Sequence, residues 1–435
     1  MIGAELAAAR AAGAPGWLAG LRRSSWETFE RLPFPTLRDE DWRRTDIRRF
    51  ELEGFQPLTD VDPAVIAAML RQRDRAAPDS AVLIDAPVPV AARNADALLA
   101  QGVIVNSLEE AATRHPELAQ RALSAAGLDT SKFGSLWSAM WRGGVFVHVP
   151  AGVEALVPVW LLHPASGDGS AVFPTTVVQL EPRASLTVVD AFASPSGAAS
   201  LFSDASVALA LGREARLDYV ALQQWGDGVW HFARHRAVLQ DGAHLRFFGA
   251  TLGARLQKAY WDVVLAGEGA EADVTGICFG DGDQHLDHQS LQDHRAPSTR
   301  SDLLLKVAVR DRARSVYSGL IDVAPEAVHA DGYVQNRNLI LSHGAKADSV
   351  PRLEIRANDV KCGHGATAGH IDPEQRFYCM ARGIDPAGAD SLIVRAFLDD
   401  ATSRLRHPGL RGLISELIDS EIAGETQAGL RSPEA

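Results

Sequence analysis

A cysteine and a histidine stand two residues apart in a glycine-rich stretch near the C-terminal end of the chain, in the run Lys-Cys-Gly-His-Gly-Ala-Thr-Ala-Gly. In an extended strand, residues i and i+2 point to the same face, so Cys362 and His364 are expected to present a thiol and an imidazole to one point. Such a pair suits a thiophilic metal ion or sulfur chemistry. Two ligands do not complete a metal site, because zinc usually takes three or four. The other interpretation is a small buried cysteine beside a histidine that hydrogen-bonds within the core.

A second group of candidate ligands lies in a segment rich in histidine and aspartate. His285, His288 and His294 belong to a residue type that binds borderline metal ions. Strand alternation puts His285 and Asp287 on one face and the other two histidines on the opposite face, so one convergent site is not implied. We expect structural or surface roles for them; the alternative is a stand-alone metal-dependent enzyme on a β-helix or cupin-like core. Cys379, in an apolar segment, is expected to lie in a core.

Composition and missing motifs argue against several function classes. The chain has 43 Lys and Arg against 55 Asp and Glu, a formal charge of −12, which argues against nucleic acid or an anionic membrane as the main partner. It has no apolar run of membrane-spanning length, and its N-terminus is expected to be an alanine-rich helix and not a secretory signal. Three cysteines without a CxxC pair favour a reducing, cytoplasmic compartment. The chain has no Walker A motif, no GxGxxG after a predicted strand, no GxSxG and no HExxH, so an enzyme with its own nucleophile is not predicted.

Three regions separate by pattern. Residues 1–142 are predicted to be mixed but mainly helical, with short buried strands at 81–84 and 103–105. Ser24 and Glu27 are placed as a capping box at a helix start. Residues 143–372 are rich in short strand-like runs, for example 145–149 and 176–180. Residues 373–435 are predicted to be helical again. The expected order is a β core between two helical domains.

A short residue pattern typical of a tight turn recurs within the middle region. A polar or glycine residue precedes an alanine, a polar–apolar alternation follows, and the alanines at 184, 215, 243 and 270 recur at intervals of 31, 28 and 27 residues. Near-regular return of one turn type is typical of stacked coils. We therefore predict a β-helix in preference to a double-sheet sandwich, which the same spacing also allows. Each coil buries its apolar face against its neighbours, so both ends need caps, and the helical end regions are expected to supply them.

An amphipathic helical hairpin is predicted after the β core. Asp385 is placed as the N-cap, with Pro386 at the first helical position. Apolar residues then recur with helical spacing at Ala389, Leu392, Ile393, Ala396 and Phe397. Pro408-Gly409 breaks the chain before a second apolar stripe.

The C-terminal third resembles the SufB/SufD family of iron-sulfur cluster assembly proteins. The matching segments are 318–321, 335–342, 351–355, 361–369, 377–378 and 382–384, and residues 35–46 are similar to the start of the family's SufD branch. SufB-type chains carry a cysteine-aspartate-serine stretch where this chain has Gln-Asn-Arg-Asn at 335–338. They also read His-Glu-Ala where this chain has His364-Gly365-Ala366. The resemblance is therefore closer to SufD than to SufB.

The resemblance implies a non-catalytic scaffold subunit with a right-handed parallel β-helix between helical N- and C-terminal domains. It implies pairing with SufB through the β-helices, and it leaves open a homodimer when SufB is absent. It also implies docking of the SufC ATPase on the C-terminal helical region, where contacts are expected from Leu392, Ile393, Ala396 and Phe397. The nascent cluster is expected at the SufB–SufD interface, where His364 matches a functional histidine and Cys362 its neighbouring cysteine. No cofactor is expected to bind this chain stably alone; an iron-sulfur cluster is expected transiently in the complex, and flavin binding is left open.

Overall fold

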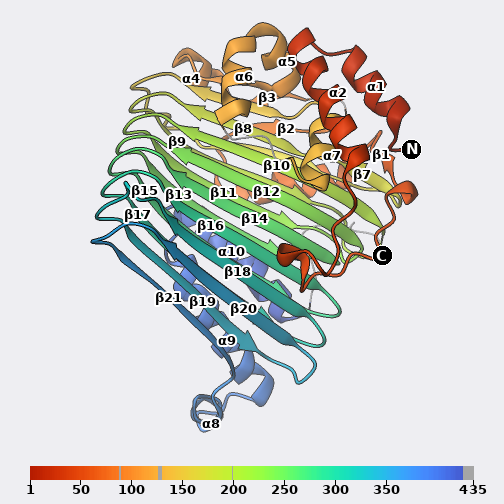
Figure 1. Cartoon of the computed structure of the whole chain (residues 1–435). Helices are drawn as coiled ribbons and strands as arrows, with labels where there is room; N and C mark the ends of the chain where they lie inside the picture. Colours follow the sequence, from red (N-terminus) through yellow and green to blue (C-terminus); the bar gives the residue numbers. More distant parts are fainter. Residues whose placement is uncertain (88–89, 126–129, 198, 425–435) are drawn as a thin grey trace.

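Two long sheets form the walls of a parallel β-solenoid that runs through the middle of the chain (Figure 1). The structure is a computed structural model and describes residues 1–87, 90–125, 130–197 and 199–424. Each coil gives one strand to either wall, and successive coils stack in parallel, as β10 does on β12. The prediction of a mainly β, parallel β-helix is therefore confirmed, and the sandwich alternative is wrong.

The walls are built as follows. Sheet A contains β5 (Val145–Val149), β8 (Thr175–Leu180), β10 (Leu201–Leu211), β12 (Val229–Leu239), β14 (Leu256–Leu265), β16 (His285–His294), β18 (Arg314–Val323) and β20 (Lys346–Ile355), with β7 (Ser170–Val172) beside β10. Sheet B contains β6 (Val159–Pro164), β9 (Ser185–Ala193), β11 (Arg216–Gln224), β13 (His244–Leu252), β15 (Glu271–Gly280), β17 (Arg300–Val309), β19 (Asp331–Ile340) and β21 (Lys361–His370).

The corners that lead into sheet B have the residue pattern that the sequence predicts for them. A residue with positive φ opens each corner, at Arg183, Glu214, Gly242 and Gly269, with φ of 60, 57, 60 and 66°. The alanine that follows each of them is buried, as the tight stacking of the corners requires. The left-handed corner continues at Ser298, His329 and Asp359. The coil repeat therefore persists to the last strand.

Apolar side chains from both walls fill the inside of the solenoid, because alternate residues of every strand point inward. The inward Trp261 is accommodated by glycines on the facing wall. A Cβ atom on Gly249 would lie 2.6 Å from its ring, and one on Gly276 would lie 2.7 Å from it. These two glycines are therefore needed for packing.

The N-terminal region contains both the predicted helices and the predicted short strands, which are β2 and β4. Its elements are α1 (Ala4–Ala12), α2 (Gly16–Arg31), η1 (Glu40–Trp42), η2 (Leu52–Gly54), β1 (Gln56–Pro57), α3 (Pro63–Ala76), β2 (Ala81–Ile84), β3 (Val90–Arg93), α4 (Asp96–Ala100), β4 (Ile104–Ser107), α5 (Leu108–Arg114), α6 (Pro116–Ala125) and α7 (Lys132–Met140). β2 extends sheet B by pairing with β6, and β4 extends sheet A by pairing antiparallel with β5. The predicted helix start at Ser24 is wrong, because the buried Leu18 and Arg22 belong to the same helix upstream of it.

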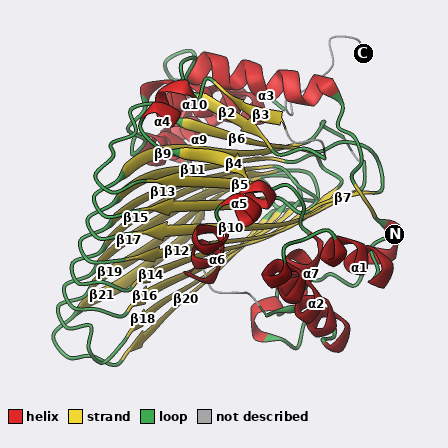
Figure 2. Cartoon of the chain, turned by 90° about the horizontal axis from the view of Figure 1, so that it is seen from above, coloured by secondary structure: helices red, strands yellow, loops and turns green. Residues whose placement is uncertain are grey.

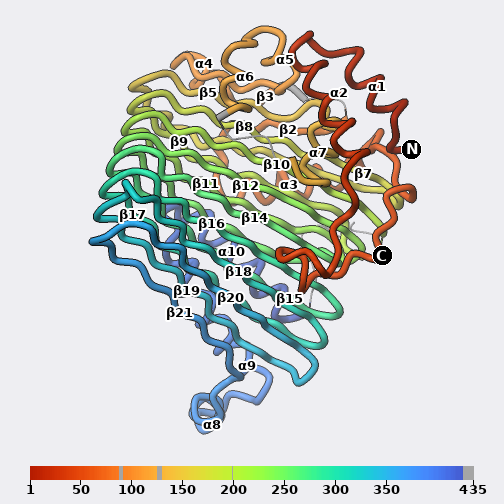
Figure 3. The backbone as a smooth tube through the Cα atoms, viewed as in Figure 1, coloured from red at the N-terminus to blue at the C-terminus, as the bar shows by residue number. Residues whose placement is uncertain are grey.

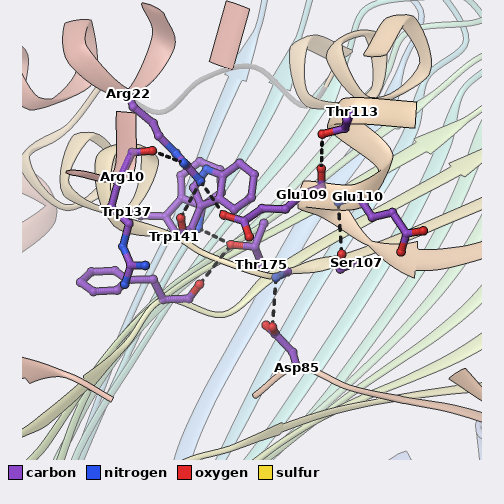
Figure 4. A network of polar contacts seen from close by, with 12 residues as sticks. Arg10, Arg22, Asp85, Ser107, Glu109, Glu110, Thr113, Trp137, Trp141 and Thr175 are labelled. Carbon is purple, nitrogen blue, oxygen red and sulfur yellow. Dashed lines mark hydrogen bonds and ion pairs between the residues drawn. The ribbon is translucent and has the colours of Figure 1, made fainter. Parts of the chain in front are cut away.

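Buried polar contacts fix the N-terminal helices to the first coils (Figure 4). The guanidinium of Arg22 donates to the carbonyl oxygen of Trp141 at 2.9 Å and pairs with Glu109 at 3.2 Å. Nε1 of Trp137 in α7 donates to Oγ1 of Thr175 in β8 at 2.9 Å. Since these buried donors have partners, the helices are held in one orientation against sheet A.

The C-terminal helices are α8 (Pro373–Met380), α9 (Pro386–Thr402) and α10 (Pro408–Ile422). α9 and α10 lie along the outer face of sheet B, next to α3 (Figure 2), whereas α8 packs mainly on α9. The predicted N-cap is confirmed, since Asp385 accepts a 2.9 Å hydrogen bond from the backbone N–H of Gly388. The expectation that these helices cap the last coil is wrong, because their buried stripe packs on outward apolar residues of sheet B such as Leu304 and Phe248.

No helix among the described residues has the length and apolar character that a membrane span requires.

The last coil of the solenoid is open. β20 and β21 are the terminal strands of their sheets, and no strand within the described residues pairs with their outer edges. Figure 3 shows this end in blue, far from α4, α5 and α6 at the other end of the stack. Most side chains of β21 are exposed, in contrast to those of β17 two coils earlier, most of which are buried.

Candidate functional site at the open end of the solenoid

Cys362 and His364 both lie on β21, the last strand of sheet B. In the strand register Cys362 stacks on Gly332 and His364 stacks on Val334, whose side chain is buried inside the solenoid. The alternation that places Val334 inward therefore places both candidate ligands on the inward face of the last coil. They share one face, as the two-residue spacing predicts.

The two side chains differ in their surroundings. Cys362 is half-buried and packs against the apolar core, and burial raises the pKa of its thiol. His364 is exposed, because no further coil covers it. The site thus combines a sheltered, protonated thiol with an accessible imidazole. Two groups from this chain leave most positions around a metal ion open.

The three histidines of the second segment do not converge. His285 faces outward and its Nε2 lies 3.0 Å from Oγ1 of Thr45, in the segment between α2 and η2. His288 is fully buried inside the solenoid, with Nε2 3.0 Å from Oγ1 of Thr251. His294 is also inward, at the far end of the same strand. Among the described residues no three His, Cys, Asp or Glu side chains form a group that could hold a metal ion. The geometry therefore gives no support to an enzyme that uses these histidines.

Outside sheet A, the same segment takes part in a buried ion pair that the sequence did not reveal. Nζ of Lys258 lies 2.7 Å from Asp287, and both side chains are fully buried. Asp287 also accepts a hydrogen bond from Thr45, and Lys258 donates to the carbonyl oxygen of Asp41 at 2.6 Å. These contacts attach the segment at 35–46 to strands β14 and β16 of sheet A.

The second predicted surface is a groove on the C-terminal helices. Leu392, Ile393, Ala396 and Phe397 of α9 line a groove of about 850 Å³, together with α8 residues and the end of β21. The opposite stripe of α9, with Val394 and Leu398, is buried on the solenoid. Leu392, which is 47% exposed, and Ala396 are exposed, whereas Ile393 and Phe397 are half-buried. The four predicted residues thus form an apolar face that the described chain covers only in part.

Cys379 does not lie in a core, so that expectation is wrong. It is half-buried in α8, a helix without a buried residue, and it lines the groove beside Tyr378. The reason is the position of α8, which packs mainly on α9 and projects beyond the sheets (Figure 1). The apolar residues of α8 therefore belong to an exposed surface and not to a core.

Two regions of the chain match protein-family profiles. Residues 163–397 match the family described as SUF system FeS cluster assembly, SufBD core domain. Residues 81–161 match the SufBD protein N-terminal region. The first match alone spans more than half of the chain.

Similar curated proteins carry the same family name. An iron-sulfur cluster assembly SufBD family protein of Staphylococcus saprophyticus is 26% identical over 306 residues, which are 70% of this chain and 66% of that protein. One of Mycobacterium leprae is 36% identical over 216 residues, which are 48% of this chain and 55% of that protein. The matched stretches thus cover less than two thirds of each relative's own length.

Proposed function

We propose that this chain, which belongs to the SufBD family of iron-sulfur cluster assembly proteins, is the SufD-type scaffold subunit of a cytoplasmic assembly complex. It does no chemistry of its own in this proposal. Its task is to pair with a SufB subunit, to dock a SufC ATPase, and to offer side chains to iron or sulfide while the cluster forms. The cluster is the cargo of the complex and not a resident cofactor of this chain.

The open last coil is the observation that carries the proposal. Unpaired strand edges on β20 and β21 are ready templates for a strand of another chain. Cys362 and His364 lie at this same end, so a SufB subunit that completes the solenoid would cover them. The remaining cluster ligands would then come from SufB. Without SufB, the same edges would allow two copies of this chain to pair.

The groove between α8 and α9 is the proposed dock for SufC. Its apolar floor offers Ile393 and Phe397, and its rim carries Asp372 and Glu374. An apolar helix face with basic residues at its margin fits this surface. Because α9 is packed on sheet B, movement of a docked SufC pair would be passed to the solenoid and to its open end.

The proposal is tested by co-expressing the chain with SufB and SufC and reconstituting the complex with iron and sulfide. We expect His364→Ala to assemble the complex normally but to gain less of the visible absorption of a cluster. His329→Ala, an exposed histidine at a solenoid corner, is the matched control and should behave as the wild type. Equal cluster formation by wild type and His364→Ala would leave this subunit with a purely architectural role.

A further inference from the structure

Two arginines line a small cavity between the N-terminal helices and the first coils of the solenoid. Arg10 belongs to α1, and Arg142 follows the end of α7. The cavity measures about 140 Å³, and Met140, Phe173 and Pro174 contribute apolar walls. Among the described residues neither guanidinium group has a hydrogen-bond or ion-pair partner, and Nε of Arg10 is buried. Since a buried donor without a partner is costly, the cavity lacks an acceptor.

The side chain of Arg22 shows that the two arginines lie close together. Its Nη1 donates to the carbonyl oxygen of Arg10 at 2.6 Å, and its Nη2 donates at 2.9 Å to the carbonyl oxygen of Trp141, the residue before Arg142. The same Nη2 pairs with Glu109 at 3.2 Å, and the side chain of Arg10 extends away from this pair (Figure 4). Three guanidinium groups thus gather around a single carboxylate.

The charges in this cluster are not balanced. Burial and then the neighbouring Arg142 lower the pKa of Arg10, and Glu109 opposes them only in part. The other ionisable groups that line the cavity are Asp85 and His163, which pair with each other at 3.1 Å. Both carboxylates of the cavity are therefore engaged by partners of their own. The positive charge of the two cavity arginines is left without a counterion among the described residues.

We propose that this cavity binds a small oxyanion of the phosphate class, held between the guanidinium groups of Arg10 and Arg142. A guanidinium group presents a fork of N–H donors that matches the oxygens of such an anion. The volume sets the size of the ligand, because drug-sized molecules fill pockets of about 300–1,000 Å³ and a water molecule takes only about 30 Å³. The apolar walls strengthen the attraction, since charges are screened less beside them.

A bound anion fastens the N-terminal helices to the solenoid. α1 packs on α2 and α7, while Asp85 after β2 and Phe173 after β7 bring the solenoid to the same cavity. The anion removes the repulsion between the two arginines across this contact. The free energy of unfolding therefore rises with anion concentration. This inference goes beyond the proposed function and does not depend on it.

Calorimetric titration of the purified full chain with inorganic phosphate, at constant ionic strength in chloride, tests the site. We expect saturable binding of one phosphate by the wild type. Arg10→Gln and Arg142→Gln should each lower the affinity at least about tenfold, as the loss of a hydrogen bond to a charged group implies. Arg31→Gln, at an exposed arginine of α2 outside the cavity, is the control and should bind as the wild type does.

Glu109→Gln separates a binding site from damage to the fold. This change removes a carboxylate that competes with the anion for the guanidinium groups, so phosphate should bind more tightly. A contact that is merely disturbed would bind it less tightly, and that result would count against the site. Should Arg10→Gln fail to fold, Arg10→Lys keeps the charge but loses the fork and should still reduce the affinity. Circular dichroism checks the fold of each variant.

Urea unfolding provides a second measurement. Phosphate also stabilises proteins in general, because it is excluded from their surface. That effect does not saturate and is equal in all variants, so the part of the midpoint shift that saturates in the wild type and is lost in Arg10→Gln belongs to the site. The inference is overturned if the wild type shows no saturable binding, or if Arg10→Gln binds phosphate as tightly as the wild type.

Discussion

Lys306 of β17 and Phe397 of α9 contact each other twice. Nζ of Lys306 donates a 2.8 Å hydrogen bond to the carbonyl oxygen of Phe397 and lies 4.8 Å from the centroid of its ring. The same ammonium group pairs with Asp400 at 2.6 Å. Since Phe397 also lines the α8–α9 groove, one buried lysine joins the groove to the solenoid two coils before its open end.

Loss of this contact should loosen α9. We expect Lys306→Met to lower the free energy of unfolding by about 1.5–3 kcal/mol, the usual range for a hydrogen bond to a charged group. Faster amide exchange should be confined to α9 and its neighbours. Arg395→Met is the control, because its ion pair with Asp419 is solvent-exposed and is worth at most about 1 kcal/mol. Urea unfolding and hydrogen exchange measure both effects; an unchanged midpoint for Lys306→Met would show that the lysine does not anchor the helix.

Truncation of the groove should reduce binding of the proposed ATPase partner. Ile393→Ala with Phe397→Ala removes apolar area that is already partly exposed, so the core should stay folded while SufC affinity falls. Leu156→Ala, at a side chain that is 78% exposed far from the groove, is the control. Calorimetric titration with SufC decides the matter. Unchanged affinity in the double variant would remove the groove as the dock.

Breaking the buried pair of Lys258 and Asp287 should be costly. Lys258→Met leaves a buried carboxylate without its cation, and such a change typically costs about 3–5 kcal/mol. The double change Lys258→Met with Asp287→Leu removes both charges and should recover a large part of that loss. Urea unfolding of the three variants gives the coupling. A double variant that is less stable than Lys258→Met would contradict this account.

Stability should fall as pH rises above neutrality because of His163. Burial alone would lower the pKa of this histidine, but its contacts with Asp190 at 2.8 Å and Asp85 at 3.1 Å raise the pKa to about 9. The folded state therefore holds a proton that the unfolded chain loses near pH 6.5. The stabilisation is complete below pH 6.5 and is lost as pH approaches 9. Burial raises the pKa of Glu421 to about 8, which adds a loss between pH 4.5 and 8.

Stability should also fall toward acid pH because of neutral histidines inside the solenoid. Burial lowers the pKa of His231 to about 3 and those of His235, His288 and His294 to about 4. The unfolded chain takes up these protons below pH 6.5 and the folded chain does not, so stability decreases from pH 6.5 toward 4. Urea midpoints measured from pH 4 to 9 should therefore peak near pH 6.5. A profile that rises steadily to pH 9 would contradict the charged state of His163.

The sequence pattern predicts the solenoid because each repeating corner is formed by residues that are adjacent in the chain. The left-handed corner and the small residue after it stand side by side in the chain, as at Arg183 and Ala184, and so does the helix start at Asp385. Contacts between coils leave no such local trace. Nε2 of His294 on β16 hydrogen-bonds the hydroxyl of Ser301 on β17 at 2.8 Å, a contact between the two walls that the strand pattern of either segment does not reveal.

The errors have a similar origin. Cys379 lies in an apolar run, and a local pattern does not distinguish apolar residues that face a core from apolar residues on an uncovered surface. The C-terminal helices were expected over the last coil because a solenoid needs caps. The apolar outer face of sheet B, which takes those helices instead, becomes visible only when outward residues such as Leu304 and Phe248 are stacked by the coil register.

The uncovered last coil also bears on how many copies of this chain a cell can keep in solution. A free strand edge can pair with any strand that reaches it, so uncovered copies of this chain would pair with one another or aggregate. In the proposed complex a partner subunit would cover these edges, so the supply of that partner would limit how much of this chain stays in solution.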